Sequence, residues 1–259
     1  MTITDLYSIL PVLVLVVWAL FLLLSDLWLS KHTPAWTPIL AVVGLLLALG
    51  SSLFLTGKSV TGFSGFILVD GFSNFLQPLF AITGILAIGL AFDYLKRLQI
   101  HHGEYYTLIL FSVSGMMLMA SAGDLLMVFL SLELLSIPLY IMASMAAPRL
   151  ESEESGLKYF LLGTFASGFL LFGIALVYGA TASTNLNSIV TVVKAGSYDP
   201  TLMIVGSVLV LISFGFKVAA VPFQSWTPDV YQGAPSPVSA FMSVGVKAAG
   251  FAALLRVFS

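Results

Sequence analysis

The chain has 259 residues, of which 59% are hydrophobic and 8% are charged, whereas soluble domains carry about 25% charged residues. A water-soluble fold could not bury this much apolar surface, so the composition predicts an integral membrane protein. The net charge of −2 gives no sign of a nucleic-acid partner. The absence of cysteine excludes thiolate-bound iron–sulfur clusters and zinc, disulfides and a cysteine nucleophile in this chain. All three histidines fall in predicted loops, which disfavours a haem between helices.

Eight stretches are apolar and long enough to cross the hydrocarbon core of a bilayer, which takes about 20 residues. In chain order these predicted spans are 7–29, 37–56, 75–95, 105–122, 124–146, 157–180, 202–223 and 235–257. A tight turn at 122–124 separates the fourth span from the fifth. The longest connections are 57–74 and 181–201, and part of the second, 186–193, is expected to form a short interfacial helix. The first span lacks the features of a cleaved signal peptide, so we expect it to be retained. The predicted fold class is an all-α polytopic helix bundle.

Basic residues in short loops predict the orientation, because cytoplasmic loops are enriched in lysine and arginine. The odd-numbered loops hold Lys31, Lys96, Arg97 and Arg149, with His32, His101 and His102 nearby, and the even-numbered loops hold Lys58 and Lys194, with Arg256 closing the last span. This bias places the N-terminus outside and the odd-numbered loops in the cytoplasm.

Ionisable residues inside the spans are the strongest functional signal. Glu133 lies in the middle of the fifth span, Lys217 deep in the seventh and Lys247 near the middle of the eighth, while Lys158 begins the sixth. A lysine or aspartate at the bilayer centre costs about 2.5–3.5 kcal/mol on insertion scales, so such residues usually have a function. We therefore interpret these four residues as a proton path. The alternatives are a structural ion pair between Glu133 and Lys217, and a Lys158 that only extends to the lipid headgroups.

The chemistry of lysine suits a proton path. Its reference pKa is about 10.4, burial lowers this value and a nearby carboxylate raises it again. Movement of Glu133 toward or away from Lys217 would therefore switch the lysine between holding and releasing a proton, without any cofactor.

Two prolines are predicted to interrupt the helices that carry these charges. Pro138 lies five residues after Glu133, and Pro222 lies five residues after Lys217. Each proline lacks an N–H and would free the carbonyl four residues earlier, beside the ionisable side chain. The segment 222–237 contains four prolines, which fits either an ordinary loop or the interrupted helix of a transporter.

The segment 216–247 resembles the signature of the antiporter-like subunits of NADH:quinone oxidoreductase. It opens with Phe216-Lys-Val-Ala-Ala-Val-Pro-Phe-Gln-Ser-Trp226 and closes with Ser243-Val-Gly-Val-Lys247. Its core, Trp226-Thr-Pro-Asp-Val-Tyr231, is most similar to subunit N (subunit 2). The stretches Ser131-Leu-Glu-Leu-Leu-Ser136 and Gly156-Leu-Lys-Tyr-Phe160 resemble the same family.

The resemblance implies a role for each matching position. Glu133 and Lys217 resemble the Glu–Lys pair of a first half-channel, Lys158 a lysine of the sixth helix, and Lys247 a bridging lysine of the eighth. It also implies a single membrane domain with three N-terminal helices in 1–100. Residues 105–257 would then form the first of two inverted five-helix repeats, with Lys217 on a discontinuous helix.

The resemblance further implies a non-redox, proton-translocating subunit in the inner membrane of a prokaryote. Its partners would be the lipid bilayer and other membrane subunits of the same respiratory complex. NADH, FMN, iron–sulfur clusters and quinone would be bound by partner subunits, because this chain contains no NAD, flavin or iron–sulfur motif.

Two departures from the family pattern leave alternatives open. Gln224 stands where many relatives have histidine, so proton entry here would not use an imidazole. The family's full-length members have about fourteen helices, and this chain corresponds to the N-terminal part only. The alternatives are a subunit of a multisubunit Na⁺(K⁺)/H⁺ antiporter, a relative from a membrane-bound hydrogenase or from a complex fed by a deazaflavin or a plastoquinone, and a structural membrane anchor that transports nothing.

Overall fold

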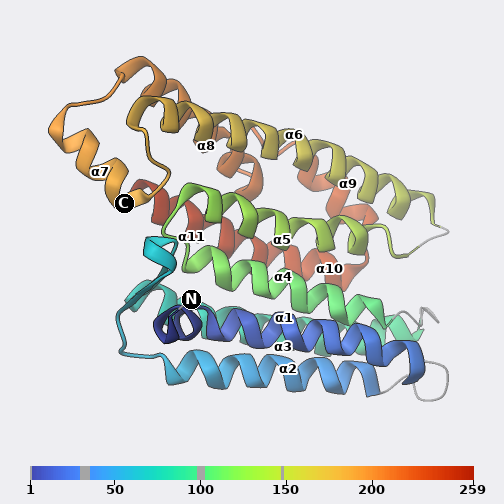
Figure 1. The fold of residues 1–259 in the computed structure, drawn as a ribbon. Coiled ribbons are helices and arrows are strands. Elements are labelled where there is room, and N and C mark those ends of the chain that lie inside the picture. Colours follow the sequence, from blue (N-terminus) through green and yellow to red (C-terminus); the bar gives the residue numbers. More distant parts are fainter. Residues whose placement is uncertain (1, 30–35, 98–102, 147–148) are drawn as a thin grey trace.

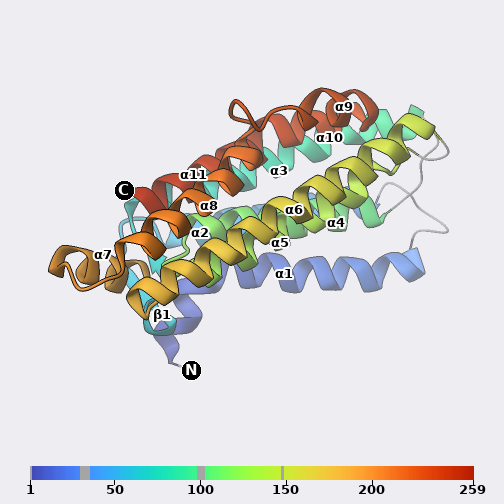
Figure 2. The ribbon, with the colours of Figure 1, turned by 90° about the horizontal axis from the view of Figure 1, so that it is seen from above.

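The computed structural model describes residues 2–29, 36–97, 103–146 and 149–259 as a bundle of long, roughly parallel helices (Figure 1). The two termini lie at the same end of the bundle (Figure 1). Seen from above, the helices form several layers rather than a single sheet of helices (Figure 2). Lys31, His32, His101 and His102, which contribute to the predicted orientation, lie outside the described residues.

The helices follow the predicted spans, which confirms the all-α polytopic fold class. They are α1 Ile3–Leu29, α2 Trp36–Phe54, α3 Gly71–Arg97, α4 Glu104–Ala120, α5 Leu125–Ala143, α6 Leu150–Thr181 and α8 Pro200–Val218. The last span consists of α10 (Ser236–Phe241), a π-helical turn (Met242–Val246) and α11 (Lys247–Phe258). Within the described residues, seven segments are long and apolar enough to cross a membrane, and the fourth predicted span, α4, has 17 residues.

The centre of the bundle is α4. It packs against α1, α3, α5 and α11, and almost all of its side chains are buried. Its contact with α5 is close because Gly115 has no side chain: a Cβ atom there would lie 2.5 Å from the backbone nitrogen of Leu135. Ser112 Oγ donates a hydrogen bond to the Leu135 carbonyl across the same contact, at 3.1 Å. Small and hydroxylated residues therefore hold the two helices together, as is usual inside membranes.

The helices α6 and α8 make a second close contact. A Cβ atom at Gly206 would lie 2.9 Å from the Gly173 carbonyl oxygen, and one at Gly173 would lie 2.8 Å from the Gly206 carbonyl oxygen. Two facing glycines let the helix backbones touch. This crossing fixes α8, and with it Lys217, against α6.

The two long connections form small elements at the end of the bundle that holds the termini (Figure 1). Residues 60–69 form a hairpin of β1 (Val60–Gly62) and β2 (Ile67–Val69) around a short 3-10 helix, η1 (Phe63–Gly65). The sequence analysis did not predict this hairpin, because three-residue strands leave no clear alternation. The short helix expected at 186–193 is present as α7 (Leu186–Ala195), and Asn185 Nδ2 beside it donates a hydrogen bond to the Gly65 carbonyl.

The seventh span is broken, as predicted, but not by the predicted mechanism. The helix α8 ends at Val218, before Pro222, and the chain continues as a short helix, α9 (Trp226–Gly233). Ala219 adopts a left-handed conformation with φ 59°. The N–H groups of Ala219 and Ala220 bond back to the carbonyls of Phe216 and Gly215, which is a Schellman motif. The prediction that Pro222 frees a carbonyl inside the helix is therefore wrong.

The predicted interruption at Pro138 is also wrong. The helix α5 runs from Leu125 to Ala143 with Pro138 inside it. A proline lacks the N–H that would donate one backbone hydrogen bond, and packing against neighbouring helices lets a membrane helix continue past it. Pro138 is buried in the bundle, so packing on both sides keeps α5 continuous.

Candidate functional site

Lys217 is buried at the C-terminal end of α8, with 4% of its surface exposed. Its Nζ donates hydrogen bonds to Ser136 Oγ on α5 at 2.7 Å and to Tyr159 Oη on α6 at 3.2 Å. It also lies 5.4 Å and 5.9 Å from the ring centroids of Tyr159 and Tyr140, and such ring faces attract cations. The negative end of the helix dipole adds a favourable interaction. These partners are all neutral, so the buried lysine has no direct counter-ion among the described residues.

Glu133 lies on α5, one turn before Ser136, and is partly buried. Its Oε1 accepts a hydrogen bond from Ser167 Oγ on α6 at 2.5 Å. Glu133 and Lys217 thus have separate hydrogen-bond partners, and these two described side chains form no ion pair. The direct Glu133–Lys217 pair is therefore not confirmed and stays a prediction.

An aromatic cluster of Tyr159, Phe216, Trp226 and Tyr231 connects α6, α8 and α9. Trp226 stacks on Tyr159 at 4.9 Å and on Phe216 at 5.2 Å, and Tyr231 packs edge-on against it at 6.1 Å, measured between ring centroids. Trp226 Nε1 also donates a hydrogen bond to the Phe216 carbonyl at 3.1 Å. Aromatic pairs in these geometries stabilise beyond their buried area, so the cluster holds α9 beside the broken end of α8.

Lys247 is the first residue of α11 and follows the π-helical turn directly. Its Nζ lies 5.6 Å from the ring centroid of Tyr231. One turn later, Gly250 lets α11 approach α8, because a Cβ atom there would lie 2.9 Å from Val218 Cγ1. Lys217 contacts Tyr159 and Lys247 contacts Tyr231, so the two lysines lie at different ends of the aromatic cluster.

Lys158 lies in a different environment. The predicted sixth span placed Lys158 at the start of a helix. The helix α6 begins at Leu150, so Lys158 lies two turns inside it. Its Nζ lies 2.6 Å from Glu154 Oε1 and 2.7 Å from Asp229 Oδ2 on α9, and 40% of its side chain is exposed. None of these contacts reaches Glu133, Lys217 or Lys247, and the role of Lys158 in a proton path stays a prediction.

Sequence reasoning missed the hydroxyl groups that hold the two central charges. The position of Ser136 could have been predicted from the sequence, because Ser136 is three residues after Glu133 and residues three apart share a helix face. Tyr159 and Ser167 gave no comparable signal, since their positions depend on how α6 packs against α5 and α8.

The arrangement can bind and move protons. Lysine and glutamate side chains exchange protons, and the hydroxyls of Ser136, Tyr159 and Ser167 can donate to one neighbour while accepting from another. Ser136 already does so, because it accepts from Lys217 and donates to the Leu132 carbonyl. Within the described part of the chain, no group of three or more His, Asp and Glu side chains is placed to bind a metal ion.

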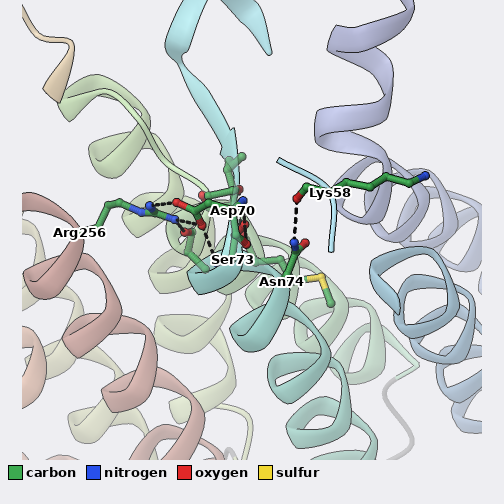
Figure 3. Close-up of polar contacts among 9 residues, drawn as sticks. Lys58, Asp70, Ser73, Asn74 and Arg256 are labelled. Atoms are coloured by element: carbon green, nitrogen blue, oxygen red, sulfur yellow. Dashed lines mark hydrogen bonds and ion pairs between the residues drawn. The ribbon is translucent and has the colours of Figure 1, made fainter. Parts of the chain in front are cut away.

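A second polar centre, the Arg256 clamp, joins Arg256 to Asp70, which lies beside Ser73 (Figure 3). The clamp consists of Arg256 on α11, Asp70 before α3 and the carbonyl of Ala120 on α4. The Arg256 guanidinium pairs with Asp70 through both Nη atoms and donates to the Ala120 carbonyl. Asp70 Oδ1 also accepts from the backbone N–H of Ser73 at 2.9 Å. Burial of Asp70 disfavours its ionised form, but the hydrogen bonds from Arg256 and Ser73 outweigh this effect and lower its pKa.

A family model described as "NADH:quinone oxidoreductase/Mrp antiporter, TM" matches residues 122–259. The chain is 47% identical over 257 residues to NADH-quinone oxidoreductase subunit N of Chloroflexus aggregans, a match that covers 98% of this chain and 53% of that protein. It is thus similar to subunit N, as the sequence motifs predicted. The chain spans about half the length of the curated relatives it matches.

The fold is similar to that of two solved structures. A chain of respiratory complex I from Thermus thermophilus, solved with bound aureothin, superposes with a TM-score of 0.81 at 38% identity, over 95% of this chain and 53% of that chain. A chain of the Mrp complex from Dietzia sp. DQ12-45-1b superposes with a TM-score of 0.80 at 19% identity, over 100% of this chain and 49% of that chain. The second likeness concerns the fold alone.

Proposed function

The chain belongs to the NADH:quinone oxidoreductase/Mrp antiporter family of membrane proteins, and we propose that it is part of a proton-translocating, non-redox subunit N of an NADH:quinone oxidoreductase. Its partners would be other membrane subunits of that complex, in the inner membrane of a prokaryote with the N-terminus outside. NADH, FMN, iron–sulfur clusters and quinone would be bound by those partner subunits, with no cofactor on this chain.

One observation carries the proposal: Lys217 is buried at the break between α8 and α9, and its hydrogen-bond partners among the described residues are all neutral. A buried ammonium without a counter-ion is poised to lose its proton, because burial disfavours the charged form. Polar groups at a helix break inside a membrane are typical of transporter sites. A purely structural lysine would be expected to form a tight ion pair.

The mechanism follows from the separate hydroxyl partners of the two charges. With Glu133 held by Ser167, Lys217 is bound by Ser136 and Tyr159 and can release its proton. When Glu133 turns from Ser167 toward Lys217, its carboxylate stabilises the ammonium and the lysine takes up a proton. The released proton would pass from Lys217 to Lys247, and Lys158 would belong to the same path from the α9 side.

The direct test is Lys217→Ala in the full-length subunit within the assembled complex. Proton uptake by reconstituted vesicles during quinone reduction should fall below detection, while the subunit content of the membranes should stay near normal. Lys96→Ala, a change in a basic residue at the end of α3, serves as the control and should pump normally. Pumping at the wild-type stoichiometry by Lys217→Ala would contradict the proposal.

The main alternative is a subunit of a multisubunit Na⁺(K⁺)/H⁺ antiporter, because the matching family model covers Mrp antiporters as well as NADH:quinone oxidoreductases. Vesicles that exchange protons for Na⁺ or K⁺ without an electron donor would support this alternative. A structural membrane subunit would show neither exchange nor any loss of pumping on replacement of Lys217.

A further inference from the structure

An apolar groove, called the α6 groove below, lies on the exposed side of α6. It is lined by α6 side chains between residues 160 and 172, among them Phe160, Phe165, Phe169 and Phe172. Its volume is about 560 Å³, within the range of about 300–1,000 Å³ that is typical of ligand sites. Phe165 is 67% exposed and Phe172 is 59% exposed. Together with α8, α6 forms the edge of the bundle farthest from α2 (Figure 1), so the groove is open to the surroundings of the bundle.

Gly168 makes the groove hollow. A Cβ atom at this glycine would meet no other group of the described chain within 4 Å, so the glycine is not needed for contact with another helix. Phe165 and Phe172 lie three residues before it and four residues after it, which places all three on one helix face. The Phe165 ring packs edge-on against Phe169, with 4.8 Å between the ring centroids. Aromatic rings therefore border a gap that the missing side chain leaves open.

The length of the α6 groove matches one leaflet of a bilayer. Residues 160–172 extend over about 18 Å of the helix axis, at about 1.5 Å per residue. Half of the hydrocarbon core of a bilayer measures about 15 Å. The groove therefore has the length of a single acyl chain that runs from the headgroup level to the bilayer midplane.

A charged cluster lies at the polar end of the groove. This Lys158 cluster consists of Glu154, Lys158 and Asp229: Lys158 Nζ lies 2.6 Å from Glu154 Oε1 and 2.7 Å from Asp229 Oδ2. One ammonium between two carboxylates leaves an excess of one negative charge. Glu154 is in line with the groove, because helical spacings of seven, four and seven residues connect it to Leu161, Phe165 and Phe172.

A phosphatidylethanolamine headgroup complements the Lys158 cluster. Its primary ammonium can donate hydrogen bonds to Glu154 and offsets the excess negative charge. Its phosphate can accept from Lys158, which has three N–H donors and uses two of them on the carboxylates. A choline headgroup has no N–H to donate, and a glycerol headgroup has no cation.

We propose that the α6 groove binds an acyl chain of a phosphatidylethanolamine molecule whose headgroup lies on the Lys158 cluster. The apolar groove selects for a lipid tail, and the charges at its end select for the headgroup. This lipid site goes beyond the proposed function and does not depend on it, because it involves neither Lys217 nor proton transfer.

Photoactivatable lipids test the site in the full-length subunit of the assembled complex. The complex is placed in nanodiscs that contain a trace of phosphatidylethanolamine, phosphatidylcholine or phosphatidylglycerol, each with the same diazirine-bearing acyl chain. Mass spectrometry of the digested subunit then measures the labelling of residues 160–172. Leu46 and Leu47, which are exposed apolar residues of α2, provide the reference for unselective contact with lipid.

Phosphatidylethanolamine should label residues 160–172 about fivefold more than phosphatidylcholine, a factor near the upper value for one exposed ion pair. Phosphatidylglycerol should label them least, because the Lys158 cluster repels its negative charge. Equal labelling by the three lipids would overturn the proposal. A neighbouring subunit that covers α6 in the complex would leave residues 160–172 unlabelled by every lipid, and this outcome would overturn it too.

Gly168→Leu tests the groove. The leucine fills the gap between the phenylalanine rings, so the labelling of residues 160–172 by phosphatidylethanolamine should fall to the level at α2. Gly89→Leu is the matched control, because Gly89 on α3 is also exposed with open space around it, and it should label like the wild type. Unchanged labelling in Gly168→Leu would show that no acyl chain occupies the groove.

Glu154→Gln tests the headgroup contact. This change leaves Lys158 paired with Asp229 and removes the excess negative charge, so labelling by phosphatidylethanolamine and by phosphatidylcholine should become equal. Glu153→Gln removes an exposed carboxylate outside the Lys158 cluster and should keep the preference. A preference that persists in Glu154→Gln would refute the headgroup contact. These measurements report lipid contact, so their failure is distinct from a failure of the proposed function, which the pumping of Lys217→Ala decides.

Discussion

Replacement of Arg256 by methionine tests how the last helix is anchored to the rest of the bundle. The guanidinium joins α11 to Asp70 and to the Ala120 carbonyl, and only 11% of the Arg256 side chain is exposed, against 37% for Asp70. Arg256→Met would leave a partly buried carboxylate without its cation and a helix-end carbonyl without its donor. The helix α11 also carries Lys247, so the contacts of Arg256 help to fix the position of Lys247.

The expected loss of stability follows from these contacts. Removing one partner of a fully buried ion pair costs about 3–5 kcal/mol. Asp70 is more than a third exposed and keeps the hydrogen bond from the Ser73 N–H, so water can replace part of the guanidinium. We therefore expect a loss of about 2 kcal/mol, which for a chain of this size lowers the Tm by roughly 4–8 °C.

Thermal unfolding of the purified subunit in detergent, followed by circular dichroism, measures this loss. Asp70→Asn removes the uncompensated charge, so the double variant Asp70→Asn/Arg256→Met should be more stable than Arg256→Met alone. Strictly additive effects of the two changes, or an Arg256→Met variant with the Tm of the wild type, would refute the reasoning.

The same pair predicts a pH dependence with a definite sign. The pKa of Asp70 is lowered in the folded protein, because the hydrogen bonds from Arg256 and Ser73 outweigh the opposing effect of burial. A lowered folded-state pKa contributes stability that is fully present above the ordinary aspartate value of about 3.9 and is lost as the pH falls below it. The Tm difference between the wild type and the double variant should therefore shrink on acidification below about pH 4. A difference that grows on acidification would contradict the assignment.

Three further predictions concern the site and its frame. Glu133→Gln should reduce proton pumping strongly while the subunit content of the membranes stays normal, and Glu133→Asp, which keeps the charge, should have a milder effect. Quinone-linked activity and immunoblots of the membranes measure these two quantities. A low subunit content for Glu133→Gln would instead favour a structural role of Glu133. Lys158→Ala should lower proton uptake less than Lys217→Ala, because Lys158 is exposed and paired away from Lys217, and an equal loss would place it at the centre of the path. Gly206→Ala should destabilise the fold by about 1–3 kcal/mol, because the added methyl group overpacks the α6–α8 contact, and it should therefore lower the Tm. Gly168→Ala, with open space around it, should leave the Tm unchanged.

The sequence was sufficient for the membrane fold and for the positions of the charged residues along it. Hydrophobic stretches of about 20 residues predict spans because the bilayer core has a set thickness, and the helices match them, including the short helix α7 and the break after Lys217. Glu133, Lys217 and Lys247 were identified because a charged side chain inside a membrane span is energetically unfavourable and is usually kept for a function. The spans and the charged residues need only the order of residues and the properties of lipid, whereas the break after Lys217 was expected from Pro222 and from the family resemblance.

The partners of those charges were decided by the tertiary structure. Ser136, Tyr159 and Ser167 reach Lys217 and Glu133 from other helices, through contacts such as Gly173–Gly206 that depend on how whole helix surfaces fit. The end of α8 was misattributed to Pro222, because a Schellman motif at Ala219 depends on backbone hydrogen bonds that no residue type signals clearly. Spans follow from the solvent around each segment, whereas polar contacts depend on the rotation and crossing of helices, which are determined only when the whole bundle packs.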